Sequence, residues 1–231
     1  MRRVGILGGI GPESTVDYYR QILARIRELE PEAGQPTILI NSIDMPQMLR
    51  LAGERRLAEL TDFLAAELGH LAAAGADFAV LASNTPHLVF DELQAVAALP
   101  LLSIVEAASR GAQARGLQRL GLLGTRFTMQ GEFYPRVFRA AGLEVVAPTE
   151  TEQVFVHDRY MNELVPGIFS TETRAAFRDL IARMSEREQL DGLILAGTEL
   201  PLLLRDEAAS AVPLLDTTRL HVDEIVAQMR A

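Results

Sequence analysis

The sequence of 231 residues contains no cysteine, and this absence excludes more chemistry than any other feature of its composition. Without a thiol there can be no disulfide, no thiolate ligand for a metal and no thiol-based catalysis. The histidines do not have the spacing of metal ligands, so the sequence predicts no metal site. They are His70, His87, His157 and His221.

Long apolar runs and an excess of positive charge are also missing. No run approaches the roughly 18 residues that a membrane span needs, and the N-terminal stretch lacks the apolar segment of a signal peptide. We therefore expect a cytoplasmic protein. The 22 basic and 31 acidic residues give a net charge of −9, which argues against nucleic acid or an anionic membrane surface as the main partner. A small anionic ligand is compatible with this net charge, because the charge of a local binding site can differ in sign from that of the whole chain.

What the sequence does contain is typical of an α/β fold. It is 48% hydrophobic and 23% charged, as in ordinary globular proteins, and short apolar runs alternate with segments of helical period. The predicted strands are Arg3–Leu7, Thr37–Ile43, Phe78–Ala82, Leu101–Ile104, Leu120–Leu123, Glu144–Ala147, Gly192–Ala196 and Leu214–Asp216. The predicted helices are Ser14–Leu29, Glu54–Ala74, Phe90–Ala97, Ile104–Arg115, Thr128–Ala141, Thr171–Glu186, Leu200–Ala208 and Arg219–Met229.

An internal repeat divides the chain into two halves. Residues 5–9, 81–85 and 100–103 resemble residues 121–125, 195–198 and 213–216, at offsets of 116, 114 and 113. We expect two pseudo-symmetric, Rossmann-like parallel-sheet domains: residues 1–105 with about 210–231, and residues 106–209. If the halves face each other, their strand ends meet in a central cleft, where open α/β sheets bind ligands. The alternative is that any two α/β units look alike.

A glycine-rich turn follows the first predicted strand. Gly9 and Gly11 let the backbone approach a ligand closely, and the start of the next helix offers N–H groups to a carboxylate or phosphate. The turn is not a dinucleotide fingerprint and lacks the lysine of a P-loop. A tight strand-to-helix turn is the alternative interpretation.

Polar residues follow two further strands at equivalent positions of the halves. After Phe78–Ala82 come Ser83, Asn84, Thr85 and His87; Asn84 and Thr85 can hold a carboxylate, and Ser83 or His87 could move protons. The alternative is a helix cap and a buried structural histidine. The matching turn of the second half holds Gly197, Thr198 and Glu199. The second-half counterpart of the glycine turn carries Thr125 and Thr128, which are carboxylate-binding candidates or a helix cap.

Four ordered motifs together resemble the aspartate/glutamate racemase superfamily, in particular its aspartate racemase branch, over essentially the whole chain. Family members read VGxLGGxGPEAT, CNTxH, LGTxxTM and GCTEL; here the segments read VGILGGIGPEST, SNTPH, LGTRFTM and GTEL. The resemblance implies two α/β domains, a homodimer, no cofactor, and a small amino acid or dicarboxylate as ligand. It also implies two cysteines that remove and return the α-proton.

This sequence departs from the family pattern at the decisive points. Ser83 and Gly197 stand where the two cysteines are expected, so racemisation by two thiols is excluded. A serine hydroxyl is a poor base near pH 7 unless a neighbour takes its proton. Pro166 stands where aspartate racemases commonly carry a basic residue, which argues against aspartate and glutamate as substrates. Arg50 could supply a basic group instead.

Three hypotheses follow. The first is a cofactor-independent isomerase that uses Ser83 with Glu199, His87 or a water as acid/base groups, and binds a carboxylate through Asn84, Thr85, Thr125 and Thr198. The second is a hydrolase or a decarboxylase-like lyase, in which His87 activates Ser83, the glycine turns stabilise an oxyanion and the space at Gly197 admits a larger substrate. The third is a non-catalytic protein that binds a small carboxylate.

Overall fold

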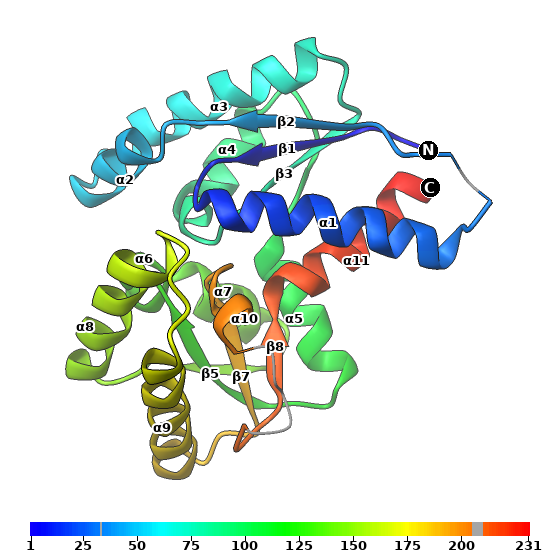
Figure 1. Ribbon diagram of the computed structural model, residues 1–231. Coiled ribbons are helices and arrows are strands. Elements are labelled where there is room, and N and C mark those ends of the chain that lie inside the picture. Colours follow the sequence, from blue (N-terminus) through cyan, green and yellow to red (C-terminus); the bar gives the residue numbers. More distant parts are fainter. Residues whose placement is uncertain (33, 205–209) are drawn as a thin grey trace. The chain divides into compact units, whose positions relative to one another are not determined.

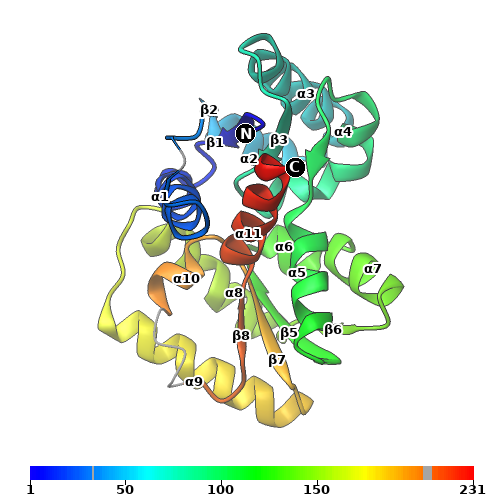
Figure 2. The same ribbon diagram turned by 90° about the vertical axis from the view of Figure 1, so that its right-hand side faces the viewer.

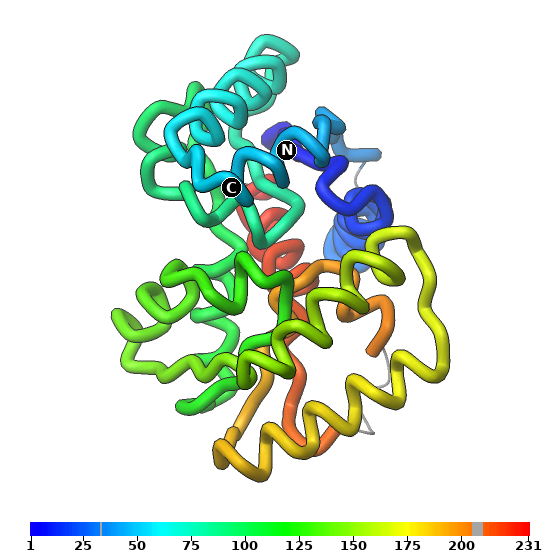
Figure 3. The backbone as a smooth tube through the Cα atoms, turned by 90° about the vertical axis from the view of Figure 1, so that its left-hand side faces the viewer, coloured from blue at the N-terminus to red at the C-terminus, as the bar shows by residue number. Residues whose placement is uncertain are grey.

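The computed structural model describes residues 1–32, 34–204 and 210–231, and its contacts divide the chain into two compact units. Unit 1 comprises Met1–Ile104 and His221–Ala231, and unit 2 comprises Val105–Leu220. The chain therefore returns to unit 1 within the last helix, α11 (Thr217–Arg230), which is the red helix in Figure 3. The sequence predicts residues 210–231 in the first domain, but strand β8 (Leu214–Asp216) pairs with a strand of unit 2 and belongs to that unit.

Unit 1 is built on a parallel sheet with the strand order β2-β1-β3-β4. Helices α1 and α11 lie side by side on one face of this sheet, and α3 lies on the other (Figure 1). The strands are β1 (Val4–Gly8), β2 (Ile38–Ser42), β3 (Phe78–Leu81) and β4 (Leu101–Leu102). The helices besides α11 are α1 (Pro12–Leu29), α2 (Met45–Gly53), α3 (Leu57–Ala73), the 3₁₀ helix η1 (Thr85–Val89) and α4 (Phe90–Val96).

Unit 2 repeats the same topology, with the strand order β6-β5-β7-β8 and all strands parallel. Helices α9 and α5 lie on opposite sides of this sheet (Figures 1 and 2). The strands besides β8 are β5 (Arg119–Gly124), β6 (Glu144–Val146) and β7 (Gly192–Ala196). The helices are α5 (Ile104–Ala114), α6 (Arg126–Gln130), α7 (Phe133–Ala140), α8 (Glu150–Arg159), the π-helical turn η2 (Tyr160–Leu164), α9 (Thr171–Glu188) and α10 (Leu200–Leu203).

The two strand orders confirm the α/β fold and the repeat. The central strands β1 and β3 correspond to β5 and β7, in the pairing that the offsets predict. Strands β1, β3 and β7 are buried along their whole length, which explains why they appear as continuous apolar runs without alternation. All eight predicted strands are present.

The predicted helices need three corrections. The segment Thr128–Ala141 forms two helices, because Gly131 adopts an extended conformation that ends α6. The segment Glu54–Ala74 becomes helical only from Leu57, since Arg55 has a left-handed φ of 57°. The predicted helix Leu200–Ala208 is observed over Leu200–Leu203, and its residues 205–208 lie outside the described residues.

Helix α11 is tied into unit 1 by a buried histidine. The Nδ1 atom of His221 lies 2.9 Å from the hydroxyl oxygen of Tyr18 on α1, and its Nε2 lies 3.2 Å from the carbonyl oxygen of Leu102 at the end of β4. His221 and Tyr18 are fully buried. The histidine thus joins three elements of one core. Within the described ranges, no helix is both long and apolar enough to cross a membrane.

Candidate active site

Within each unit, the polar turns predicted from the sequence follow neighbouring strands. The pairs β1–β3 and β5–β7 are parallel, so the turns that follow them lie at one edge of each sheet, where open α/β sheets bind ligands. The side chains at these edges are almost completely buried, with at most 7% of their surface exposed. They are Ser83, Asn84, Thr85 and His87 in unit 1 and Thr125, Thr128, Thr198 and Glu199 in unit 2.

The glycine turn after β1 is held by a threonine of its own unit. Gly9 and Gly11 have φ angles of 80° and 83°, which glycine adopts without strain. The N–H of Gly9 donates a hydrogen bond of 2.9 Å to Oγ1 of Thr15 on α1. A Cβ on Gly9 would lie 2.5 Å from Oγ of Ser42. The Gly9 amide is thus already bonded, and the tight-turn interpretation accounts for both glycines without a ligand.

His87 does not act on the Ser83 hydroxyl in this structure. Its Nδ1 lies 3.1 Å from the backbone carbonyl oxygen of Ser83, and its Nε2 accepts a 3.3 Å hydrogen bond from the N–H of Ile104. The ring stacks on Phe90 with 4.8 Å between centroids. Burial lowers the pKa of His87 to about 4, so the imidazole is neutral near pH 7. Both ring nitrogens of His87 bind backbone groups. The structure therefore indicates a packing role for His87 and not the predicted catalytic one.

This arrangement removes the support for the hydrolase hypothesis. A serine nucleophile needs a base that accepts its proton, and the histidine four residues away binds the Ser83 carbonyl rather than its hydroxyl. Ser83 itself lies two residues after the end of β3 and is 7% exposed. It remains a candidate for proton transfer without a serine–histidine pair.

Thr125 and Thr128 pair with each other at the start of α6. The Thr125 side chain caps the helix by accepting from the N–H of Thr128, at 3.4 Å, and the two hydroxyl oxygens are 3.2 Å apart. The cap is therefore Thr125 rather than Thr128. Both hydroxyls have structural partners, so a bound carboxylate would have to replace one of these bonds.

The space beside Gly197 is filled by a tyrosine. A Cβ placed on Gly197 would lie 2.9 Å from both Cζ and the hydroxyl oxygen of Tyr160, closer than real Cβ atoms come to such atoms. Tyr160 is 4% exposed and begins the π-helical turn after α8. The suggestion that Gly197 leaves room for a larger substrate is thus incorrect, because the aromatic ring already occupies that room.

Tyr160 and Thr198 both bond the carboxyl group of Glu199. The phenol of Tyr160 donates a short hydrogen bond to Oε2 of Glu199, and the Thr198 hydroxyl donates to the same oxygen at 3.2 Å. Glu199 is only 1% exposed. Burial, and next the charge of the Glu199 carboxylate, raise the pKa of Tyr160 well above its ordinary value. Unit 2 thus holds a buried carboxyl–phenol pair at the end of β7.

The model of the family described as Asp/Glu/Hydantoin racemase matches residues 7–225. The chain belongs to this family. The resemblance to aspartate/glutamate racemases seen in the four motifs is thereby confirmed.

Relatives of the family cover nearly the whole chain. The chain is 26% identical over 227 residues to the broad specificity amino-acid racemase RacX of Bacillus subtilis strain 168, covering 93% of this chain and 92% of RacX. It is 31% identical to an aspartate racemase homologue from Pyrococcus horikoshii OT3, with a TM-score of 0.85 and full coverage of both chains. The Picrophilus torridus aspartate racemase shares the fold, with a TM-score of 0.77, 21% identity, and coverage of 100% of this chain and 95% of that chain.

The basic residue suggested for carboxylate binding is not part of either polar edge. Arg50 is exposed in the last turn of α2. It therefore lies apart from the buried polar side chains, and its part in carboxylate binding stays a prediction. Pro166 is also exposed, in the turn after η2.

In the part of the chain that the structure describes, no cluster of three or more histidine, aspartate or glutamate side chains could hold a metal.

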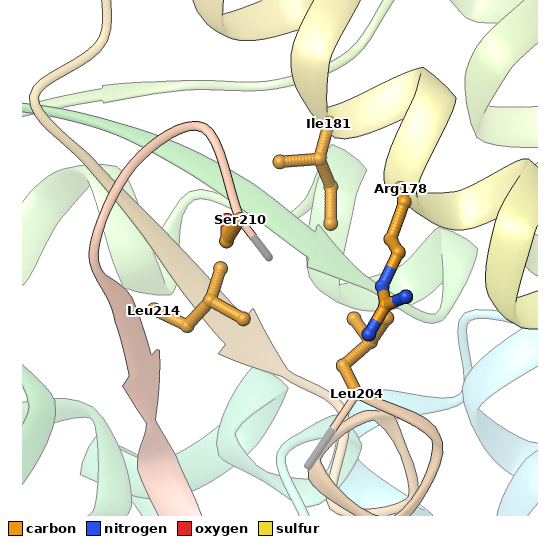
Figure 4. Close-up of a pocket in the computed structure, with 5 residues that line it drawn as sticks. All are labelled: Arg178, Ile181, Leu204, Ser210 and Leu214. Atoms are coloured by element: carbon orange, nitrogen blue, oxygen red, sulfur yellow. The ribbon is translucent and has the colours of Figure 1, made fainter. Parts of the chain in front are cut away.

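A small pocket of unit 2 contains none of the predicted site residues. Figure 4 shows Arg178 and Ile181 of α9 facing Leu204, Ser210 and the β8 residue Leu214. Leu204 and Ser210 are the chain neighbours of residues 205–209, which lie outside the described part. The pocket therefore receives no functional assignment.

Proposed function

We propose that this protein is a cofactor-independent racemase or related isomerase of a small amino acid, in which Ser83 and Glu199 take part in proton transfer. Ser83 lies in the turn after β3 of unit 1, and Glu199 lies in the turn after β7 of unit 2. The name of RacX, a broad specificity amino-acid racemase, favours an amino acid as substrate. The absence of the family's cysteines requires groups other than thiols.

The observation that carries this proposal is the burial of Glu199. A carboxyl group with 1% exposure is costly to bury, and titratable groups kept in such surroundings are concentrated at functional sites. Its position directly after Gly197 and Thr198 matches the motif segment GTEL. Asn84, Thr85 and Thr198 supply polar groups that can bind a substrate carboxylate.

The test is exchange of the α-proton in deuterated water, followed by proton NMR. The panel contains both enantiomers of aspartate, glutamate and smaller amino acids, together with maleate, malonates and simple esters. We expect the α-proton signal of at least one amino acid to disappear. The Ser83→Ala variant should slow that exchange by about 10²-fold or more, since acid/base groups contribute roughly 10²–10⁴.

A matched control is Ser185→Ala on α9. Ser185 has the same 7% exposure as Ser83, and its hydroxyl has no hydrogen-bond partner among the described residues. Removing it should leave both exchange and stability near the wild-type values. Loss of carbon dioxide or hydrolysis of an ester would replace the proposal with a lyase or hydrolase. Line broadening of a compound without exchange would replace it with a non-catalytic binding protein.

The proposal includes a homodimer in the cytoplasm. Val16 and Tyr19 lie three residues apart on α1 and each expose 43% of their surface, so they share one helix face that a second copy could cover. Sedimentation velocity should then give twice the 25.3 kDa mass of one chain. A single species of monomer mass at micromolar concentration would contradict this.

A further inference from the structure

The phenol of Tyr160 lies between Gly197 and the carboxyl group of Glu199. Its Cζ and hydroxyl oxygen are each 2.9 Å from the position that a Cβ of Gly197 would take. On its other side, the hydroxyl donates to Oε2 of Glu199. Because Gly197 has no side chain, the phenol of Tyr160 occupies the space that a side chain at position 197 would fill.

The local backbone fixes the ring in this position. Tyr160 begins η2, where the helix passes from α-helical to π-helical hydrogen bonding, and such π-turns occur frequently at functional sites. The ring belongs to the core cluster that contains Val156, Leu164 and Leu200. The phenol is therefore preorganised beside Glu199 before any ligand binds.

We propose that Tyr160 is the proton-transferring group of unit 2 and that Glu199 is the reservoir for its proton. The proposal deepens the proposed function and rests on it. Tyr160 is assigned the contact with the substrate carbon, and Glu199 acts through Tyr160. Thr198 orients the Glu199 carboxyl group by donating to Oε2.

The proton transfer balances without a cofactor. The phenolic oxygen takes the proton from the substrate Cα, while its own proton passes along the existing hydrogen bond to Oε2 of Glu199. The electron pair of the C–H bond stays on the substrate and is delocalised into its carboxylate. In the opposite direction of racemisation, the phenol protonates a Cα carbanion that another group has formed, and Glu199 passes its proton to the phenolic oxygen; return of the proton by the same phenol gives exchange without inversion. Because the pKa of Tyr160 is raised, a free phenolate is avoided, and the two proton movements are coupled.

The Tyr160→Phe variant tests this assignment. Phenylalanine keeps the ring that fills the space at Gly197 and removes only the hydroxyl. We expect kcat for α-proton exchange to fall about 10²–10⁴-fold, with KM within about twofold of wild type, because the lost group moves a proton and does not bind substrate.

A second buried tyrosine of unit 2 supplies the control. Tyr134 on α7 is completely buried, with 0% of its surface exposed. Its hydroxyl is hydrogen-bonded to the Thr217 side chain. Tyr134→Phe therefore removes a buried, bonded hydroxyl of the same kind. We expect it to change stability and to leave kcat unchanged. If both variants lose exchange equally, the effect is structural and the assignment of Tyr160 is wrong.

The remaining outcomes separate this inference from the proposed function. If wild-type protein exchanges an α-proton and Tyr160→Phe retains more than about half of kcat, the proposed function stands and Tyr160 is not the proton-transferring group. If wild-type protein exchanges nothing in the panel, the proposed function fails and this inference fails with it. If Tyr160→Phe does not fold, 3-fluorotyrosine at position 160 decides: it keeps the hydrogen bond and makes the phenol more acidic. A changed kcat supports the assignment, and an unchanged kcat overturns it.

Discussion

Replacing Gly197 with alanine is expected to destabilise the protein by about 1–3 kcal/mol, the usual cost of adding a methyl group where a packed core has no room. The added carbon would lie 2.9 Å from Cζ and the hydroxyl oxygen of Tyr160, and closer still to Cε2. The ring cannot withdraw easily, because it is buried and its hydroxyl is bonded to Glu199. Urea unfolding monitored by circular dichroism measures the loss.

A double-mutant cycle identifies Tyr160 as the cause. Tyr160→Ala alone should cost roughly 3–5 kcal/mol, as for other buried aromatic residues. Combined with Gly197→Ala it should cost less than the sum by about 0.5–3 kcal/mol, because the steric conflict disappears. The control is Gly69→Ala in α3, where an added Cβ meets no atom within 4 Å; alanine should stabilise that helix by roughly 0.5–1 kcal/mol. Strict additivity of the first two substitutions would show that Tyr160 does not fill the space at Gly197.

Substituting Glu199 with glutamine is expected to lower α-proton exchange by about 10²–10⁴-fold while the protein stays folded. The amide has nearly the same volume as the carboxyl group, and its oxygen can still accept from the hydroxyls of Tyr160 and Thr198. What the variant loses is a group that can accept and return a proton. The measurement is the exchange rate at saturating substrate, with the folded fraction determined in the same sample.

The control for this variant is Glu152→Gln on α8. Glu152 is in the same unit, and a bidentate pair with Arg187 lowers its pKa to about 2. Glutamine also serves at this position of a capping box, so the variant loses mainly the ion pair and should exchange at the wild-type rate. Retention of more than about half of the wild-type rate by Glu199→Gln would remove Glu199 from the proposed chemistry.

Much of the fold could be predicted because the sequence patterns of its strands and helices are local, each lying within a short segment. Parallel strands appear as short apolar runs, most clearly where they are buried on both faces as in β1, β3 and β7, and all eight strands can be predicted in this way. Two helices were missed although the sequence carries their start signals. Asp44 followed by Pro46 caps α2, and Thr149 with Glu152 forms the capping box of α8. Helix α8 has little apolar periodicity, whereas α2 is amphipathic but has only nine residues, shorter than the windows in which helical periodicity is recognised.

The candidate site was less predictable, because its decisive contacts are distant in sequence. Tyr160 and Glu199 are 39 positions apart, and no spacing rule connects a tyrosine after one helix with a glutamate after a strand. His87 illustrates the opposite case. Its position beside Ser83 suggested a catalytic pair, whereas the backbone partners that determine its role, Ser83 O and Ile104 N, become visible only in three dimensions.

Unit 1 is discontinuous in sequence, and this has a consequence for its synthesis on the ribosome. The sheet and α1 are made before unit 2, but residues that complete their core, in His221–Ala231, are made only after it. Val222, Ile225 and Met229 belong to the same cluster as Tyr18 and Ile22 of α1. Nascent unit 1 must therefore keep an exposed apolar face while Val105–Leu220 of unit 2 are translated, and its core can close only after the residues of α11 have been made.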